Sequence, residues 1–400
     1  MRSSELSTLN IRLHSLAIFR NLLNDPVLSA LSRYLGSLDS DSTAGSVAKY
    51  AEFVSRLYDA GSTTLAQYVQ QIVGDNENTY IRRIGRGLEP VEEMVESVRH
   101  ELEILQAVAD LTPKKLRLGL NWEGYLPSFK AETVDIAGHY RKRCENIGKF
   151  GYGIYARHHM FYVNSEGRIV PVHNPDKTRL ASLIDYKREQ QIILDNTLAL
   201  LEGKPAANIL LSGDAGTGKS STVKAVVNEL SYKGLRILEV RKEQLHAIPA
   251  ILDELNSNPL KFILFIDDLS FQKDDDNFSA LKAILEGSVS AKSRNVVIYA
   301  TSNRRHLVKE SFSSRDGDDV HRNDTMQELL SLSERFGIQV TFQKPNKEVY
   351  LGIVHHLAQE KGVTMDAAQL DMLAERFALG RGGRSARAAT QFIDGLLAKQ

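Results

Sequence analysis

The chain has 400 residues, more than a single hydrophobic core usually holds, so we expect two or three domains. Charged residues make up 25% of the chain and apolar residues 42%, and its 50 basic residues balance its 50 acidic ones. A net charge of zero excludes a general electrostatic attraction to nucleic acid or to an anionic membrane, so any such binding would need a local patch.

The cysteine content and the N-terminus restrict the cellular setting. The single cysteine, Cys144, excludes an intramolecular disulfide and a cysteine-rich zinc site. The first residues have no long apolar core with a small-residue cleavage site after it, so they do not predict a secretory signal. No run approaches the roughly 18 apolar residues of a membrane-spanning helix. We therefore expect a cytoplasmic protein with no membrane partner.

Residues 1 to about 120 are predicted to be mainly helical. The clearest helix spans Pro90–Asp110, where apolar residues recur at alternating spacings of four and three. This stripe consists of Val91, Val95, Val98, Leu102 and Leu105. Because it covers only about two heptads, packing within a small bundle is favoured over a dimerising coiled coil.

The segment 140–173 combines basic and aromatic residues with two short apolar runs around Asn164–Gly167, which predict a β-hairpin near 160–172. Basic groups beside aromatic rings can hold single-stranded nucleic acid. The rings can equally pack a small core, so nucleic-acid binding is possible but not favoured. Core packing is also the preferred interpretation of Trp122, Tyr125 and Phe129. A turn before residue 177 predicts the end of an N-terminal, partner-binding domain at residue 176.

From residue 177 the pattern alternates between strand and helix. Five apolar runs predict strands at Ile209–Leu211, Leu235–Val240, Phe262–Ile266, Val296–Ala300 and Ile338–Phe342. Such alternation predicts an α/β core over 177–345 with a mostly parallel, five-stranded sheet that is covered on both faces. After it, three amphipathic helices are expected near 346–361, 366–378 and 384–398, which form a C-terminal helical lid over 346–400.

A phosphate-binding motif follows the first of these strands and leads into a helix. The residues GDAGTGKS match the pattern G-x-x-x-x-G-K-[ST] in the setting it requires. The glycines allow backbone N–H groups to point at phosphate oxygens, and the helix N-terminus favours the anion. Lys219 should reach the β- and γ-phosphates of a nucleotide, and the Ser220 hydroxyl should bind Mg²⁺. The predicted nucleotide-binding residues are Gly213, Asp214, Ala215, Gly216, Thr217, Gly218, Lys219, Ser220 and Ser221.

Two aspartates end the apolar run FILFI. Isolated carboxylates are costly away from water, so Asp267 and Asp268 need solvent or a cation. Magnesium usually takes one or two carboxylates, directly or through water. With a phosphate loop upstream, Asp267 is predicted as a Mg²⁺ ligand beside Ser220, and Asp268 as the carboxylate that polarises the attacking water.

Polar residues at three later positions could act on the same phosphates. Asn303 ends the fourth predicted strand, and Arg335 precedes the last one. Arg384 and Arg387 begin the final helix, where the helix dipole disfavours cations and so suggests a nearby anion. The alternatives are that Arg335 pairs locally with Glu334 and that the other two arginines are surface charge.

Together these segments resemble the AAA+ ATPases and, more closely, a bacterial AAA+ family described as a domain of unknown function. The resemblance covers about residues 177–398 and rests on LLSGDAGTGKSSTVKA, GLRILEV, KFILFIDDLSF, LKAILEG, NVVIYATSNRRHL, SLSERFGI and GGRSARAATQFID. It implies that Asn303 is the sensor 1 residue and Arg335 an arginine finger that acts on a neighbouring subunit's nucleotide. Sensor 2 would be Arg387 or, nearly as well, Arg384. The segment around Leu183 to Tyr186, with Leu183 and Ile184 foremost, would lie against adenine.

One residue departs from the general AAA+ pattern, because most active members have glutamate where this chain has Asp268. A shorter side chain sets the carboxylate back by about one bond, and a misplacement near 1 Å can cost about 10²-fold in rate. We therefore expect a slow ATPase that uses ATP and Mg²⁺, forms a homo-oligomer, and remodels or loads a macromolecular partner, with an unknown protein as that partner. The alternative is a nucleotide-dependent switch or adaptor that resembles helicase loaders, in which binding matters more than turnover.

Overall fold

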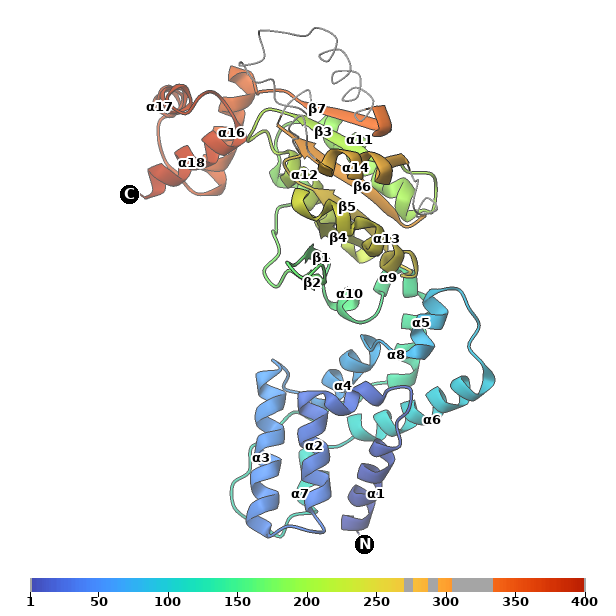
Figure 1. Cartoon of the computed structure of the whole chain (residues 1–400). Helices are drawn as coiled ribbons and strands as arrows, with labels where there is room; N and C mark the ends of the chain where they lie inside the picture. The colour runs from blue at the N-terminus through green and yellow to red at the C-terminus, as the bar shows by residue number, and fades with distance from the viewer. Residues whose placement is uncertain (1, 270–275, 287–293, 304–333, 399–400) are drawn as a thin grey trace. The chain divides into compact units, whose positions relative to one another are not determined.

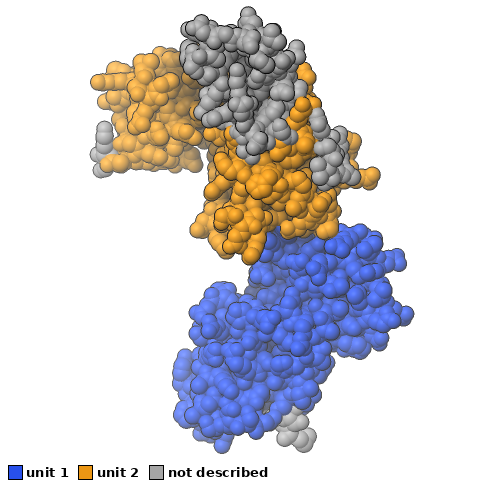
Figure 2. Space-filling model, viewed as in Figure 1, with its two compact units in different colours: residues 1–157 blue, residues 158–400 orange. Residues whose placement is uncertain are grey.

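The computed structural model describes residues 2–269, 276–286, 294–303 and 334–398. The chain divides into two compact units, Met1–Arg157 and His158–Gln400 (Figure 2). This division differs from the predicted domain boundary after residue 176, because the intervening segment pairs with the sheet of the second unit. Within the described residues, every helix is too short or too polar to cross a membrane.

The first unit is helical and is built on one large apolar core (Figure 1). Its core contains large rings such as Phe19, Tyr34, Tyr50 and Phe53, all fully buried. Its elements are α1 (Arg2–His14), η1 (Arg20–Asn24), α2 (Pro26–Ser37), α3 (Thr43–Asp59), α4 (Leu65–Gly74), α5 (Thr79–Gly85), α6 (Glu92–Ala109), α7 (Pro113–Arg117), α8 (Ile136–Glu145), α9 (Ile147–Phe150) and α10 (Ile154–Arg157).

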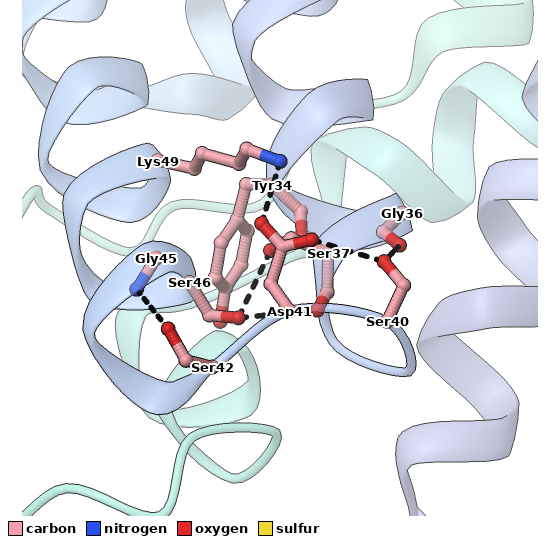
Figure 3. Close-up of polar contacts among 9 residues, drawn as sticks. All are labelled: Tyr34, Gly36, Ser37, Ser40, Asp41, Ser42, Gly45, Ser46 and Lys49. Carbon is pink, nitrogen blue, oxygen red and sulfur yellow. Dashed lines mark hydrogen bonds and ion pairs between the residues drawn. The ribbon is translucent and has the colours of Figure 1, made fainter.

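Polar side chains cap several helices of this unit. Figure 3 shows the turn between α2 and α3, where the Ser42 side chain accepts a hydrogen bond from the backbone N–H of Gly45 and so caps α3. The Ser37 and Ser46 hydroxyls lie 3.1 Å apart and join the two helices in a buried hydrogen bond. Such caps satisfy backbone groups that the helix itself leaves unpaired.

Helix α6 forms where the apolar stripe predicted it, but only the second half of the stripe is buried. Val98, Leu102 and Leu105 pack in the core, whereas Val91 and Val95 are exposed. The core interpretation of the segment that follows was wrong for Trp122 and Tyr125, which are 52% and 89% exposed, although Phe129 is buried. These two rings lie on a stretch without a helix or strand, so no periodic pattern directs them inward.

The second unit contains a seven-stranded sheet in the order β2-β1-β4-β5-β6-β3-β7. All neighbours are parallel except β1 and β2, which form an antiparallel hairpin. The strands are β1 (Met160–Val163), β2 (Ile169–Pro171), β3 (Ile209–Gly213), β4 (Leu235–Glu239), β5 (Lys261–Ile266), β6 (Val296–Ser302) and β7 (Ile338–Phe342). The mostly parallel α/β fold is confirmed, and the predicted count of five strands rises to seven.

The two extra strands come from the hairpin that we expected inside the N-terminal domain. Strand β1 lies parallel to β4, with Met160 opposite Ile237, and the backbone N–H of Ile237 donates to the His159 carbonyl. The central strands β3, β5 and β6 are buried on both faces, as parallel strands between helix layers must be.

Helices accompany the sheet and then continue beyond it (Figure 1). With the sheet lie η2 (Leu180–Ser182), α11 (Lys187–Leu201), α12 (Lys219–Leu230), η3 (Ser231–Lys233), η4 (Lys242–Ala247), α13 (Ile248–Asn256) and α14 (Asp276–Glu286). After β7 come α16 (Lys347–Glu360), α17 (Ala367–Gly380) and α18 (Ala386–Leu397), near the predicted positions. These last three helices share a separate core that includes Tyr350 and Phe392. Because β3, β5 and β6 are parallel, the segments that follow them meet at one edge of the sheet.

Candidate phosphate and magnesium site

The loop between β3 and α12 has the backbone of an anion cradle. Gly213, Gly216 and Gly218 all have positive φ angles, of 139°, 79° and 90°. A Cβ atom on Gly213 would lie 2.0 Å from the carbonyl oxygen of Phe342, so only glycine fits there. Gly218 forms the N-cap of α12, so the free N–H groups of the first helical turn face the loop.

Lys219 is held inside this loop, with only 5% of its surface exposed. Its Nζ donates to the carbonyl oxygens of Gly213 and Asp214, at 2.8 Å each, and to Asn303 Oδ1 at 3.0 Å. Burial lowers the pKa of Lys219, while the nearby aspartates oppose this shift. A buried ammonium among neutral acceptors is poised to receive an anion, because a charged partner would offset its desolvation.

Ser220 and Asp267 meet beside this lysine. The Ser220 hydroxyl donates to Asp267 Oδ1 at 2.6 Å, and the Thr301 hydroxyl donates to the same oxygen at 2.6 Å. A serine hydroxyl and a carboxylate are hard oxygen donors of the kind that Mg²⁺ takes. Two protein ligands leave the remaining positions to phosphate oxygens and water, as is usual for this ion. The residues present therefore fit a magnesium site.

Asp268 and Asn303 lie at the exposed mouth of the site. The Asn303 amide nitrogen donates to Asp268 Oδ1 at 2.6 Å, while its oxygen accepts from Lys219. Asn303 thus links the buried ammonium to the exposed carboxylate. Asp268 has a φ of 55°, in the left-handed region, and its backbone N–H donates to Thr301 Oγ1 at 2.9 Å.

Thr301 is the residue that sequence reasoning missed at this site. It stands two residues before Asn303 on β6 and is 2% exposed. The signal that could have found it is the polar run TSN at the end of an otherwise apolar strand. Its contacts with two aspartates depend on the register between β5 and β6, which the sequence does not show.

The two arginines near the last helix occupy different environments. The Arg387 backbone N–H donates to the Gly216 carbonyl at 3.4 Å, and a Cβ on Gly216 would lie 3.1 Å from Arg387 Cβ. Arg384 instead forms a two-pronged ion pair with Glu375, at 2.8 and 2.6 Å. The structure therefore brings Arg387 to the phosphate loop and leaves Arg384 engaged among the C-terminal helices. Arg335 is partly buried just before β7.

The structure also shows where the remaining loop residues and the segment expected to lie against adenine are located. Thr217 is buried and donates to the Asp214 carbonyl, and Ser221 lies in the first turn of α12. Ile184 packs against the core of the last three helices. Leu183 lies between η2 and α11, and its carbonyl accepts from the Lys187 side chain.

Tyr186, the last residue of the segment expected to lie against adenine, adopts a left-handed φ of 67° at the start of α11. The centroid of its ring lies 4.9 Å from the centroid of the Phe342 ring, and its hydroxyl donates to the Gln343 carbonyl. This segment therefore contacts both the chain after β7 and the C-terminal helices.

The basic and aromatic segment 140–162 is largely packed. Four of its rings are buried: Tyr140, Tyr152, Tyr155 and Phe161. Arg143 is the most buried basic residue of this segment, and its guanidinium donates to the Asp75 carboxylate at 2.7 Å. This distribution favours the packing interpretation over a row of stacking platforms for bases.

Comparison with solved structures finds proteins of low sequence identity. The RuvB Holliday junction branch migration motor of Thermotoga maritima is 18% identical, with a TM-score of 0.37 over 54% of this chain and 63% of that one. The FIGL-1 AAA domain in complex with ADP is 17% identical, with a TM-score of 0.36 over 50% and 67%. PCH-2 of C. elegans is 18% identical, with a TM-score of 0.38 over 53% and 63%.

No curated protein matches the sequence. The similarity to the motor spans less than two thirds of that protein's own length. A family model matches residues 156–400, more than half of the chain, and this range begins just before the hairpin that joins the sheet. The chain belongs to the family described as "Protein of unknown function (DUF815)".

Proposed function

We propose that this protein is an AAA+ ATPase that binds ATP with Mg²⁺ and hydrolyses it slowly. One observation carries the proposal: the Ser220 hydroxyl and the Asp267 carboxylate, 47 residues apart in the chain, meet at 2.6 Å beside the buried Lys219. A loop that cradles phosphates, a lysine for the β- and γ-phosphates and a hydroxyl–carboxylate pair for the metal are the parts that phosphoryl transfer requires.

The side chains around the loop take separate roles in this proposal. Lys219 and the N–H groups of the first turn of α12 hold the phosphates, and bound magnesium would offset the charge that develops on phosphate oxygens. Asp268 orients the attacking water, with Asn303 fixing its carboxylate. Arg387 approaches the γ-phosphate from the C-terminal helices. Since Asp268 is one bond shorter than glutamate, turnover is slow.

Assembly and partner binding complete the proposal. Arg335 acts as a finger on the nucleotide of a neighbouring subunit, which requires a homo-oligomer, and such an arginine can raise the rate roughly 10³–10⁵-fold. The N-terminal helical unit selects a protein partner that the ATPase cycle remodels or loads. ATPase rate per subunit should therefore rise with protein concentration and fall in Arg335→Ala; a rate that is flat in both comparisons contradicts assembly.

The second candidate function is a nucleotide-loaded switch or adaptor, favoured by the short Asp268 side chain, because slow hydrolysis would leave nucleotide binding as the functional event. The substitution Asp268→Glu separates the two functions. If hydrolysis rises sharply while the protein keeps its biological activity, slow turnover is a timing device, and binding is the functional event. If activity depends on the rate, the protein is a motor.

Nucleotide binding itself is tested with a fluorescent ATP analogue, with and without MgCl₂. Asp267→Asn should abolish the gain in affinity that Mg²⁺ provides and should stop hydrolysis. The control is Asp195→Asn, an exposed carboxylate on α11 that accepts a hydrogen bond from the Gln191 side chain. Failure of the unmodified protein to bind ATP in the presence of Mg²⁺ would contradict the proposed function.

A further inference from the structure

We propose that Thr301 is a positioning residue of this site, whose one hydroxyl sets the orientation of both aspartates. The inference rests on the proposed function, because it concerns how the chain prepares for Mg²⁺ and water. The Thr301 Oγ1 atom donates to Asp267 Oδ1 at 2.6 Å and accepts from the Asp268 N–H at 2.9 Å. A hydroxyl has one hydrogen to donate, and here it is committed to the carboxylate.

The first observation behind this inference concerns Asp267, the carboxylate proposed to bind Mg²⁺. Asp267 Oδ1 receives two hydroxyl donors, from Ser220 and Thr301. Among the residues that the structure describes, no hydrogen bond reaches its second oxygen, Oδ2. The pair of donors therefore fixes the rotation of the carboxylate and leaves one oxygen for the ion. If bound Mg²⁺ engaged the Ser220 hydroxyl, Thr301 would be the remaining described donor to Asp267.

The second observation concerns the backbone after β5. Regular pairing ends at Ile266, opposite Ala300. Beyond that point Thr301 provides hydrogen bonds in place of regular strand pairing. Its hydroxyl accepts a hydrogen bond from the Asp268 N–H, and its carbonyl accepts one from the Leu269 N–H at 2.7 Å. Asp268 takes a left-handed conformation that non-glycine residues adopt only when surrounding contacts compensate. These two bonds supply that compensation and direct the Asp268 side chain towards Asn303.

A merely structural explanation of Thr301 makes a different prediction. A buried hydroxyl, 2% exposed, needs partners wherever it lies, and its loss could lower stability without affecting the metal. A positioning role instead predicts that nucleotide binding through the loop and Lys219 survives the loss, whereas the contribution of Mg²⁺ weakens. The dependence on Mg²⁺ is thus the observable that separates the two.

The experiment compares full-length Thr301→Val, which keeps the shape of the side chain without the hydroxyl, with Thr301→Ser, which keeps the hydroxyl. The probe is a fluorescent ATP analogue titrated in EDTA and then at increasing MgCl₂. For Thr301→Val we expect a roughly tenfold or greater rise in the Mg²⁺ concentration that gives half of the maximal gain in nucleotide affinity. This corresponds to the loss of one hydrogen bond to a charged group. Affinity in EDTA should stay within about twofold, and Thr301→Ser should remain close to the unmodified protein.

Several outcomes overturn the inference. One is an unchanged dependence of nucleotide affinity on Mg²⁺ in folded Thr301→Val. Another is an equal loss of nucleotide affinity with and without Mg²⁺, a result that would assign Thr301 a structural role only. If Thr301→Val does not fold, Thr301→Ala is measured in the same way and judged by the same two results. Absence of nucleotide binding in the unmodified protein would instead overturn the proposed function, and the inference with it.

Discussion

At the scale of single residues, the buried carboxylate of Glu101 shows how one side chain can organise a turn. Glu101 lies on α6, is 5% exposed, and accepts three backbone hydrogen bonds. The donors are the N–H groups of Ala17, Ile18 and Phe19, at 2.9, 3.0 and 2.8 Å. They belong to the segment between α1 and η1, so the carboxylate ties the start of the chain to the middle of the bundle.

We expect Glu101→Ala to lower the free energy of unfolding of the first unit by at least about 3 kcal/mol, since it leaves three N–H groups without their acceptor. Urea denaturation monitored by circular dichroism measures the loss. The matched control is Glu103→Ala on the same helix, an exposed glutamate beside His100, which should change stability by no more than about 0.5 kcal/mol. Similar losses in both variants would show that the three contacts contribute little.

Cys144 allows a residue-scale prediction about pH. Burial raises the pKa of its thiol to about 11, although the residue lines a cavity of about 730 Å³ beside α6 and α8. At pH 8 the thiolate fraction is then far below that of a free cysteine with a pKa near 8.5. Iodoacetamide should react on the order of 100-fold more slowly with the folded protein than with urea-unfolded protein, as followed by mass spectrometry. Equal rates would contradict the raised pKa.

The residue-scale predictions that the sequence supports are those whose chemistry is encoded in one contiguous segment. The phosphate loop, Lys219 and Ser220 follow from one contiguous motif in a strand–helix setting. Thr301 did not follow, because its role arises from the register between β5 and β6, which no local pattern indicates.

At the scale of elements, the C-terminal helices separate two arginines that the sequence left nearly equivalent. Arg384 belongs to the loop before α18 and binds Glu375 on α17, whereas Arg387 lies in the first turn of α18 against the phosphate loop. Spacing along a helix start could not distinguish them, because the distinction depends on how α18 approaches Gly216. The hydrogen bond between Arg384 and Glu375 also lowers the pKa of that glutamate.

We expect Arg387→Ala to weaken ATP binding roughly tenfold, since it removes one cation from the phosphates, and to leave the melting temperature nearly unchanged. Arg384→Ala should do the reverse, with near-normal ATP affinity and a lower melting temperature, because Glu375 loses its two-pronged partner. Titration with a fluorescent ATP analogue and thermal unfolding on the same samples give both values. A loss of affinity confined to Arg384→Ala would assign the phosphate role to that residue instead.

At the scale of the whole molecule, the sequence indicated an α/β unit with helices before and after it, and five of its seven strands. The position of the unit's first strand could not be predicted, because a hairpin pattern over 160–172 does not say which sheet it joins. In the structure β1 covers the outer edge of β4, through three opposed residue pairs. An uncovered parallel strand would leave a row of N–H and C=O groups unpaired.

This arrangement predicts how the chain can be divided. The fragment 158–400 retains the sheet, its described core and the core of the last three helices, so we expect it to fold and to bind a fluorescent ATP analogue with an affinity close to that of the full chain. The fragment 177–400, cut at the boundary that the sequence suggested, lacks β1 and β2 and exposes the edge of β4. It should melt at a lower temperature and aggregate more readily in size-exclusion chromatography. If the two fragments have equal stability and solubility, the hairpin is an accessory to the sheet, and the ATP-binding unit begins after it.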